Sequence, residues 1–284
     1  MPSLRYVVAD VFTDTPLTGN QLAVFTDGRE LDAETMQALA LEVGFSETVF
    51  VLPAEADGDV RIRIFTPRVE LPFAGHPVLG TAFVLGAPLQ RGVLSLETGS
   101  GIVPVELERD ESGSIVFGRM TQPVPTVEPY PDPESLLAAL GVARSELPVE
   151  RYDNGAQPTF VLLRSEQEVA DLRPNVAALA ALEVMASCSA GAGARWKTRM
   201  FAPHAGVAED PATGSAAGPL AGHLCRPGLV AWDEWIEIAQ GAEIGRPSTL
   251  FARVEGSRDG IERVEVGGSA VIVARGEFRL DARG

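Results

Sequence analysis

The chain has 284 residues, with 23 Lys and Arg against 39 Asp and Glu, which gives a net charge of −16, and 45% of its residues are hydrophobic. Such an acidic protein repels phosphate backbones and anionic lipids, so neither nucleic acid nor a membrane surface is an expected partner. The 29 Gly, the 21 Pro and a charged fraction of only 22% exclude a disordered chain and a helical bundle, and they favour a globular, strand-rich protein.

Periodicity in the hydrophobic pattern predicts the following elements in chain order. The first half should contain strands at 5–12, 22–25, 48–52, 60–65, 93–96 and 102–107. The second half should contain strands at 159–163, 198–201, 235–238, 250–254, 264–266 and 270–274. Helices are expected at 32–43, 133–140 and 176–186, with two more at 77–86 and 216–225.

The helices expected at 77–86 and 216–225 are apolar on every side, which predicts that each is buried inside its own domain. Pro77 suits the first position of a helix, where its missing N–H has no cost, and this places His76 at the N-cap. Ser215 takes the equivalent position of the second helix, and Ser is among the favoured N-cap residues.

An internal repeat relates the two halves of the chain. The segment 70–75 reads ELPFAG and 209–214 reads EDPATG, 139 residues apart, and an F-x-P triplet precedes each one. Downstream, LSLETG at 94–99 and IEIAQG at 236–241 are 142 residues apart, which is also half the chain. We therefore expect two related domains, 1–119 and 120–284, joined near the Pro-rich segment 120–133. The last strand, about 270–284, could pack back on the first domain.

The starts of the two buried helices are the expected binding site. The first turn of a buried helix has unpaired N–H groups and the positive end of the helix dipole, so an anion is its natural partner. Gly75 and Gly214 stand just before the expected helix starts, where the lack of a side chain lets a ligand reach the backbone. If the domains face each other across a pseudo-twofold axis, both helix starts line one cleft for a small carboxylate.

Four side chains near these helix starts could supply an acid or a base: Glu47, His76, Asp210 and Ser215. Each also has a purely structural interpretation. Glu47 could be an edge carboxylate, or a buried acid whose raised pKa suits general acid or base catalysis. His76 and Ser215 could be caps only, and Asp210 could be a charge favoured by the helix dipole.

Other motifs are weak or missing. The GxG at 191–193 has no third Gly, because Trp196 stands there, and no GxxxxGK[ST] occurs, which argues against a nucleotide cofactor. The three His are far apart without an HExxH, so no metal site is expected. Cys188 and Cys225 lack CxxC spacing and are expected in the core. Arg246 could hold a substrate, although a structural turn is the preferred interpretation.

The sequence also indicates where the protein works. The amino-terminal residues MPSLRYVVADVF read as a strand rather than a secretory signal, and no apolar run approaches the roughly 18 residues of a membrane span. Two cysteines cannot build a disulfide framework, which fits a reducing compartment. We therefore expect a cytoplasmic protein.

Five motifs, in order along nearly the whole chain, resemble the PhzF family, the phenazine biosynthesis isomerase and its relatives. They are DVFTDTPLTGNQLAVF at 10–25, FSETVFV at 45–51, ELPFAGHPVLGTA at 70–82, EDPATGSA at 209–216 and QGAEIGRPS at 240–248. The resemblance implies an α+β fold of the diaminopimelate epimerase type, with two pseudo-symmetric domains. Each domain would be a rolled β-sheet around a central buried helix, and the active site would lie in the cleft between them.

The resemblance also implies a site and a reaction. Glu47 would be the general base, with His76, Asp210 and Ser215 as the other catalytic groups. The substrate-binding residues would be Asn20, Gly75, Gly214 and Ala216. The expected activity is a cofactor-independent isomerisation in which a proton of a small carboxylated substrate is removed and delivered elsewhere, and the expected assembly is a homodimer.

Two alternatives remain open on the sequence alone. The first is an amino-acid epimerase or racemase of the same fold. Related epimerases use two cysteines beside the helix starts, and here Ala74 and the pair 211–212 occupy those places, which argues against it. The second alternative is a non-catalytic protein that binds a small carboxylate in the same cleft.

Overall fold

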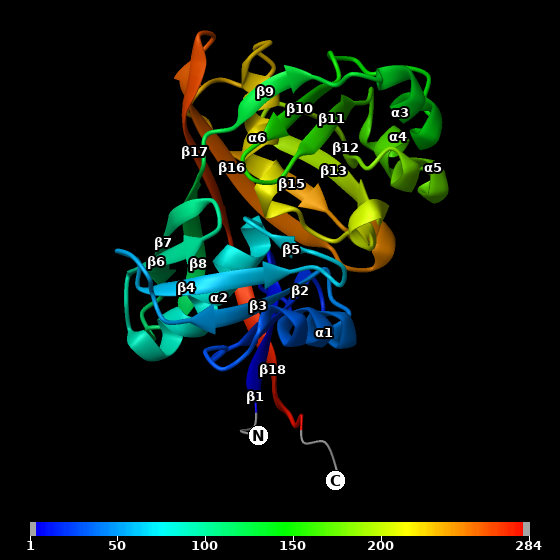
Figure 1. Cartoon of the computed structure of the whole chain (residues 1–284). Helices are drawn as coiled ribbons and strands as arrows, with labels where there is room; N and C mark the ends of the chain where they lie inside the picture. Colours follow the sequence, from blue (N-terminus) through cyan, green and yellow to red (C-terminus); the bar gives the residue numbers. More distant parts are fainter. Residues whose placement is uncertain (1–3, 281–284) are drawn as a thin grey trace.

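The computed structural model describes residues 4–280 as two lobes, which lie one above the other in Figure 1. The lower lobe contains helices α1 (Ala33–Val43) and α2 (Gly75–Leu89). Its strands are β1 (Leu4–Val11), β2 (Asn20–Phe25), β3 (Glu47–Leu52), β4 (Val60–Phe65), β5 (Glu70–Leu71), β6 (Val93–Thr98), β7 (Gly101–Arg109) and β8 (Ile115–Gln122). These strands curl around α2, which packs against most of them and is buried along nearly its whole length.

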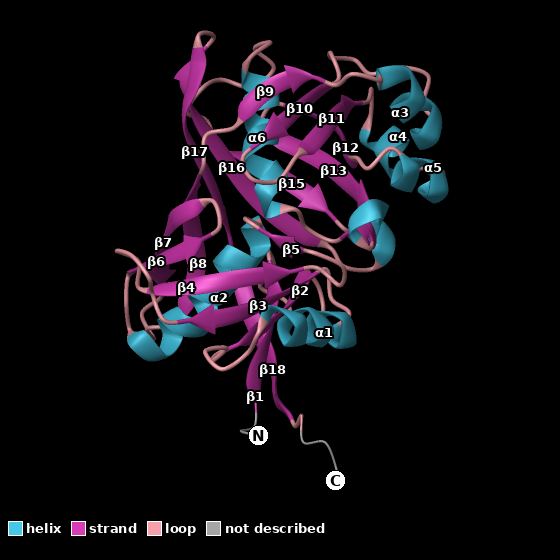
Figure 2. Cartoon of the chain, in the orientation of Figure 1, coloured by secondary structure: helices cyan, strands magenta, loops and turns pink. Residues whose placement is uncertain are grey.

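The upper lobe repeats this plan around helix α6 (Gly214–Cys225), every residue of which is buried. Its strands are β9 (Thr126–Pro129), β10 (Glu150–Asp153), β11 (Pro158–Leu162), β12 (Met185–Ala192), β13 (Arg195–Ala202), β14 (Val207–Asp210), β15 (Ile236–Gln240), β16 (Ser248–Ser257) and β17 (Gly260–Gly268). The remaining helices are α3 (Pro133–Leu140), α4 (Glu166–Ala170), α5 (Val176–Ala181) and the 3-10 turns η1 (Pro203–Ala205) and η2 (Ala242–Ile244). Figure 2 shows α3, α4 and α5 gathered on the outside of this lobe.

The strand pairings of the two lobes follow the same order. In the lower lobe β2 pairs parallel with β3, β3 antiparallel with β4, and β4 parallel with β6, while the short β5 adds to β4. In the upper lobe β11, β12, β13 and β15 repeat these relations, and the short β14 adds to β13. The internal repeat predicted from the sequence is therefore confirmed as a repeat of structure.

Two pairings connect the lobes. Strand β8 pairs antiparallel with β7 of its own lobe and with β17, and Met120 is opposite both Val105 and Val266. Strand β18 (Ala270–Phe278) pairs antiparallel with β1, with Phe278 opposite Leu4, and Figure 1 shows the two strands side by side. The boundary at 119/120 stays a prediction, and residues 281–284 of the expected last strand lie outside the described residues.

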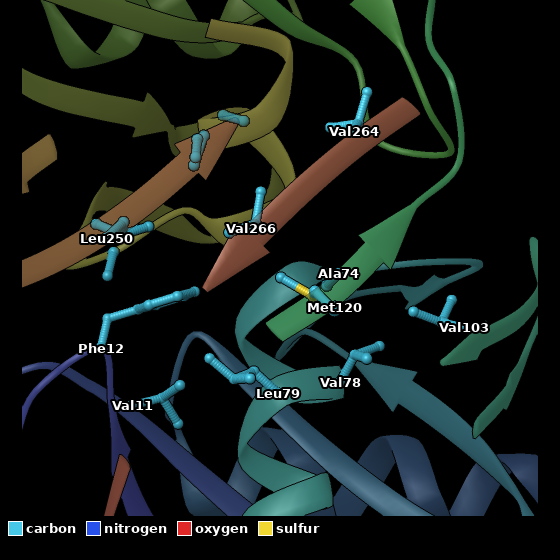
Figure 3. Close-up of a cluster of buried hydrophobic side chains, with 14 of the residues drawn as sticks. Val11, Phe12, Ala74, Val78, Leu79, Val103, Met120, Leu250, Val264 and Val266 are labelled. Carbon is cyan, nitrogen blue, oxygen red and sulfur yellow. The ribbon is translucent and has the colours of Figure 1, made fainter. Parts of the chain in front are cut away.

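The hydrophobic core is continuous between the lobes. Figure 3 shows Phe12 of the lower lobe reaching toward Leu250 and Val266 of the upper lobe. All three side chains are fully buried. The Phe12 backbone has a φ of 63°, and its N–H and C=O bond to Ser269 and Thr249, so both neighbouring segments fix this conformation.

Two local predictions were wrong. The helix expected at 176–186 ends at Ala181, and β12 begins at Met185, because pairing with both β11 and β13 outweighs the helix propensity of this Ala-rich segment. The segment 120–133, near which we expect the domains to join, contains the end of β8 and all of β9. Pro129, the proline within β9, is tolerated because β9 pairs with β10 at a sheet edge.

The second wrong prediction concerns the helix caps. Helix α2 begins at Gly75 after Ala74, and α6 begins at Gly214 after Thr213, and neither preceding side chain makes a capping hydrogen bond. His76 and Ser215 are therefore second helical residues rather than caps. No helix among residues 4–280 is long and apolar enough to cross a membrane.

Candidate active site

The first turns of α2 and α6 meet at the junction of the two lobes. A Cβ atom placed on Gly75 would lie 2.4 Å from both the carbonyl carbon of Gly214 and the nitrogen of Ser215. One placed on Gly214 would lie 3.0 Å from the nitrogen of His76. Only glycine permits this approach of backbone to backbone, which explains the two glycines of the repeat.

A cavity of about 300 Å³ opens beside this contact. All four predicted catalytic residues line it, together with both glycines: Glu47, His76, Asp210, Ser215, Gly75 and Gly214. Much of the remaining wall is apolar and includes Leu71, Phe73, Val184, Met185 and Met200. A polar end and a partly apolar wall suit a small ligand that carries an anionic group.

Backbone N–H groups are available at the polar end. Helical bonding in α2 begins with the Val78 N–H, which donates to the Ala74 carbonyl, and in α6 with the Ala216 N–H, which donates to the Thr213 carbonyl. The N–H groups of the preceding residues, His76 and Ser215 among them, lie outside the helical pattern. Two helix N-termini therefore direct their N–H groups and dipoles toward one cavity.

Glu47 is the first residue of β3, and its side chain is 13% exposed. Its Oε2 lies 3.5 Å from Nε2 of His76, and neither atom has a hydrogen-bond partner in the described part of the chain. Burial raises the pKa of the Glu47 carboxyl well above its usual range, and the nearby charge of Asp210 adds to this effect. A carboxyl in this state is a strong base once it is ionised and a ready acid once it is protonated.

Asp210 ends β14 and is almost fully buried. Its Oδ1 accepts a 2.9 Å hydrogen bond from Asn20, and its Oδ2 accepts a 2.6 Å bond from the Thr213 hydroxyl. Burial raises the pKa of Asp210 to about 6, although hydrogen bonds from Thr213, Ser46 and Asn20 act in the opposite direction. Asp210 and Glu47 together form a carboxyl pair, and the second proton of this pair dissociates only at a raised pH.

His76 is a neutral group in this site. Burial lowers its pKa to about 3, and a hydrogen bond to the Gln21 backbone offsets only part of that effect. Its Nδ1 lies 3.2 Å from the amide nitrogen of Asn20, and its Nε2 has no hydrogen-bond partner among residues 4–280. Nε2 is the ring nitrogen on the side of Glu47, 3.5 Å from Oε2.

The repeat does not place the same group in both lobes. Glu47 begins β3, and the corresponding position at the start of β12 is Met185. Both residues line the cavity. The lower lobe thus has a carboxyl group at this position, and the upper lobe has a thioether there.

Two predicted substrate-binding residues do not line this cavity. Asn20 is 1% exposed, and its amide contacts protein groups. The N–H of Ala216 is already bonded within its helix. Arg246 is structural, as preferred, because its guanidinium bonds Asp10 and the carbonyls of Thr18 and Gly19.

The cysteines are unsuited to catalysis. Cys188 and Cys225 are buried and outside the cavity, and burial raises their pKa to about 12 and about 11. Neither thiol is ionised near neutral pH. In the described residues, no group of three or more His, Cys, Asp or Glu side chains is placed to hold a metal ion.

Sequence reasoning missed several residues that build the site. Gln240 donates to the Asp210 carbonyl and to the Thr213 hydroxyl, and its side-chain oxygen accepts the Thr213 N–H. This bonding holds the turn that leads into α6. Thr159 and His204 line the cavity and each has a buried polar atom without a partner among residues 4–280. Only Gln240 carried a signal, since it is the polar residue in the second copy of the repeated polar-Gly ending.

Known proteins resemble this chain in sequence and in structure. A family model described as phenazine biosynthesis-like protein, PhzC-PhzF, matches residues 9–276. The trans-2,3-dihydro-3-hydroxyanthranilate isomerase of Pseudomonas aeruginosa is 50% identical over 277 residues, which cover 97% of this chain and 99% of that protein. A Bacillus anthracis phenazine biosynthesis protein of the PhzF family has a TM-score of 0.85 at 25% identity, covering 99% of this chain and 100% of that one.

More distant structures share the fold alone. A probable proline racemase from Agrobacterium radiobacter has a TM-score of 0.69 at 13% identity, covering 98% of this chain and 93% of that one. Together with the paired lobes, these similarities confirm the predicted α+β, epimerase-like fold of two pseudo-symmetric sheets, each rolled around a buried helix.

Proposed function

The chain belongs to the phenazine biosynthesis-like (PhzC-PhzF) family and is an isomerase, and on this premise we propose that Glu47 moves a proton within a cyclic, unsaturated carboxylate. The substrate that we propose is trans-2,3-dihydro-3-hydroxyanthranilate, which gives the Pseudomonas aeruginosa relative its name. The observation that carries the proposal is the carboxyl of Glu47, whose Oε2 has no hydrogen-bond partner among residues 4–280, in a cavity that the first turns of two helices also line.

The substrate name describes the chemistry required. The ring has two conjugated double bonds, a carboxylate, an amine and a hydroxyl. The hydroxyl-bearing carbon adjoins one end of this diene, and the carboxylate is attached to the other end. Glu47 would take the hydrogen on the hydroxyl-bearing carbon as a proton, and the electron pair left behind would spread over the diene into the carboxylate. Protonated Glu47 would then return the proton to the carboxylate-bearing carbon, so the product is an isomer.

The charge that develops in this step requires stabilisation. We propose that the substrate carboxylate lies at the first turns of α2 and α6, against the N–H groups near Gly75 and Gly214, with Ser215 beside it. Prearranged N–H dipoles in a water-poor cavity stabilise such charge by several kcal/mol, on the order of the loss seen when one such donor is removed. His76 and Asp210 would complete the proton-transfer set, with His76 neutral.

The unequal repeat favours an isomerase over a racemase. Racemisation without a cofactor requires a proton acceptor on one face of the substrate and a donor on the other. The position equivalent to Glu47 in the upper lobe belongs to Met185, which cannot exchange a proton. Removal and return of the proton by Glu47 therefore fits the cavity better.

The direct test is solvent exchange followed by NMR. The protein is incubated in deuterated water with trans-2,3-dihydro-3-hydroxyanthranilate, and in parallel with paired L and D amino acids. We expect isomerisation of the first compound and no deuterium at the alpha carbon of any amino acid. Exchange at amino-acid alpha carbons would favour the racemase, and binding without turnover or exchange would favour the non-catalytic alternative.

Glu47→Gln tests the base itself. The amide keeps the shape of the side chain but cannot accept the proton, so we expect turnover to fall by at least about a hundredfold with substrate still bound. Glu97→Gln is the matched control, because Glu97 is a buried glutamate of the same lobe that bonds the N–H groups of Glu55, Ala56 and Gly58 outside the cavity. An active Glu47→Gln variant would refute the mechanism.

A further inference from the structure

The Asn20 side chain lies where the two lobes meet behind the carboxyl pair. Its amide nitrogen is 2.9 Å from Oδ1 of Asp210 and 2.9 Å from the carbonyl oxygen of Ala212, both in the upper lobe. The same nitrogen is 3.2 Å from Nδ1 of His76 in the lower lobe. One buried amide therefore touches acid and base groups that come from different halves of the chain.

Counting hydrogens decides between these contacts. An amide nitrogen carries two hydrogens, and three neighbours compete for them. The contacts with Oδ1 of Asp210 and with the Ala212 carbonyl are both 2.9 Å, whereas the contact with Nδ1 of His76 is longer, at 3.2 Å. Both amide hydrogens therefore go to the upper lobe, one to the Asp210 carboxylate and one to the Ala212 carbonyl.

The backbone of Asn20 is held as firmly as its side chain. Asn20 begins β2, and the carbonyl of the preceding Gly19 accepts a 2.8 Å bond from Arg246 of the upper lobe. The Gly19 N–H donates to the Pro247 carbonyl, and the Arg246 guanidinium is fixed by Asp10. The Asn20 amide is thus part of a segment that hydrogen-bonds to both lobes, which gives the amide a defined position relative to Asp210.

We propose that Asn20 is a positioning residue, which orients the Asp210 carboxylate toward the cavity and holds it ionised beside Glu47, without touching the substrate. The inference rests on the proposed function, because it assigns Asn20 a role in the same proton transfer. It also replaces the expected substrate contact, since Asn20 lies outside the cavity wall.

The physical consequence concerns the proton shared by the carboxyl pair. Hydrogen bonds to a carboxylate favour its charged form, and Asn20 is one of three donors that do so for Asp210, with Thr213 and Ser46. The titratable groups that face Asp210 are Glu47, His76 and Glu209. With Asn20 in place, the proton that Glu47 takes from the substrate stays on Glu47 instead of passing to Asp210, so Glu47 can return it to the substrate.

The experiment compares Asn20→Leu with Asn154→Leu. Asn154 is a matched control, since it is 3% exposed and its amide donates a 3.0 Å bond to the first turn of α6, at the Ser215 carbonyl, without reaching a titratable group. The Asp210 carboxyl is titrated directly by NMR in protein labelled with ¹³C at the Asp side chains, and Asp210→Asn identifies its signal.

We expect Asn20→Leu to raise the midpoint of the Asp210 titration by about one pH unit, the size expected for one hydrogen bond to a charged group. The acid limb of kcat/KM should move to higher pH with it, while Asn154→Leu changes neither. Asn20→Ser, which removes at least one amide hydrogen and perturbs packing less, should shift the midpoint in the same direction if Asn20→Leu fails to fold.

An unmoved Asp210 midpoint in the Asn20 variants, or an equal shift in Asn154→Leu, would overturn the inference. The NMR titration requires no turnover. If the proposed substrate is not turned over, the titration can still be carried out. A failure of the proposed function can therefore be distinguished from a failure of this inference.

Discussion

Replacing Asp210 by Asn is expected to make the folded protein more stable above neutral pH. The substitution keeps the shape of the side chain, so its oxygen can still accept from Asn20, and its new amide can donate to the Thr213 hydroxyl. What it removes is a carboxylate whose burial is unfavourable. The same change should reduce turnover, since it deletes one member of the carboxyl pair.

The magnitude follows from the pKa of Asp210. Burial raises this pKa from 3.8 to about 6, so the folded state binds more protons than the unfolded state between these values. The stability of the natural protein therefore falls as pH rises through this window. Asn does not titrate, so the stability of Asp210→Asn does not fall for this reason. The advantage of Asp210→Asn should be about 1.6 kcal/mol at pH 5 and about 3 kcal/mol at pH 7.5.

Urea denaturation of both proteins at several pH values measures this difference. The control is Asp10→Asn, because Asp10 is also buried but lies 2.6 Å from Arg246, and its loss leaves a guanidinium without its carboxylate partner. That variant should be destabilised at pH 7.5, opposite in sign to Asp210→Asn. The reasoning is refuted if Asp210→Asn is no more stable than the natural protein at pH 7.5, or if its advantage does not grow with pH.

Three further predictions follow. Gly75→Ala should unfold at a lower temperature by several degrees or fail to fold, because its Cβ would meet backbone at 2.4 Å, whereas Gly92→Ala, with open space around it, should melt like the natural protein. Arg246→Met should cost about 3 to 5 kcal/mol in urea denaturation, and adding Asp10→Asn should recover part of that loss if the buried unpaired charge is the cause. Homodimerisation, which the family resemblance implies, stays a prediction, and sedimentation velocity should find a dimer; a monomer would contradict it.

Local sequence patterns were sufficient for elements whose neighbours are close in the chain. The strand expected at 60–65 and the helix expected at 133–140 have the predicted bounds, because regular alternation and an Asp-Pro start are local signals. Strand β8 was missed, since Gly118 interrupts its pattern for a tertiary reason, the packing of Leu79 and Phe83 of α2 against it. Pairing with strands far along the chain determines the structure of that segment.

The same distinction applies to the site. The repeated Gly motifs, offset by half the chain, were visible in the sequence, and they led to Gly75, His76, Gly214 and Ser215 on the cavity wall. The function of Asn20 was not visible, because its partners are 190 and 192 residues away and no periodicity links them. A hydrogen-bond network between lobes is a property of the folded chain rather than of any local pattern.

The pairing of β18 with β1 has a consequence for how the protein is made. The lower lobe is built from the first strands to leave the ribosome, yet β1 receives one of its two neighbours from residues 270–278. During synthesis, one edge of β1 therefore stays open until the rest of the chain has been translated. The upper lobe, whose strands lie between, can assemble first, so the segment synthesised earliest is among the last to complete its sheet.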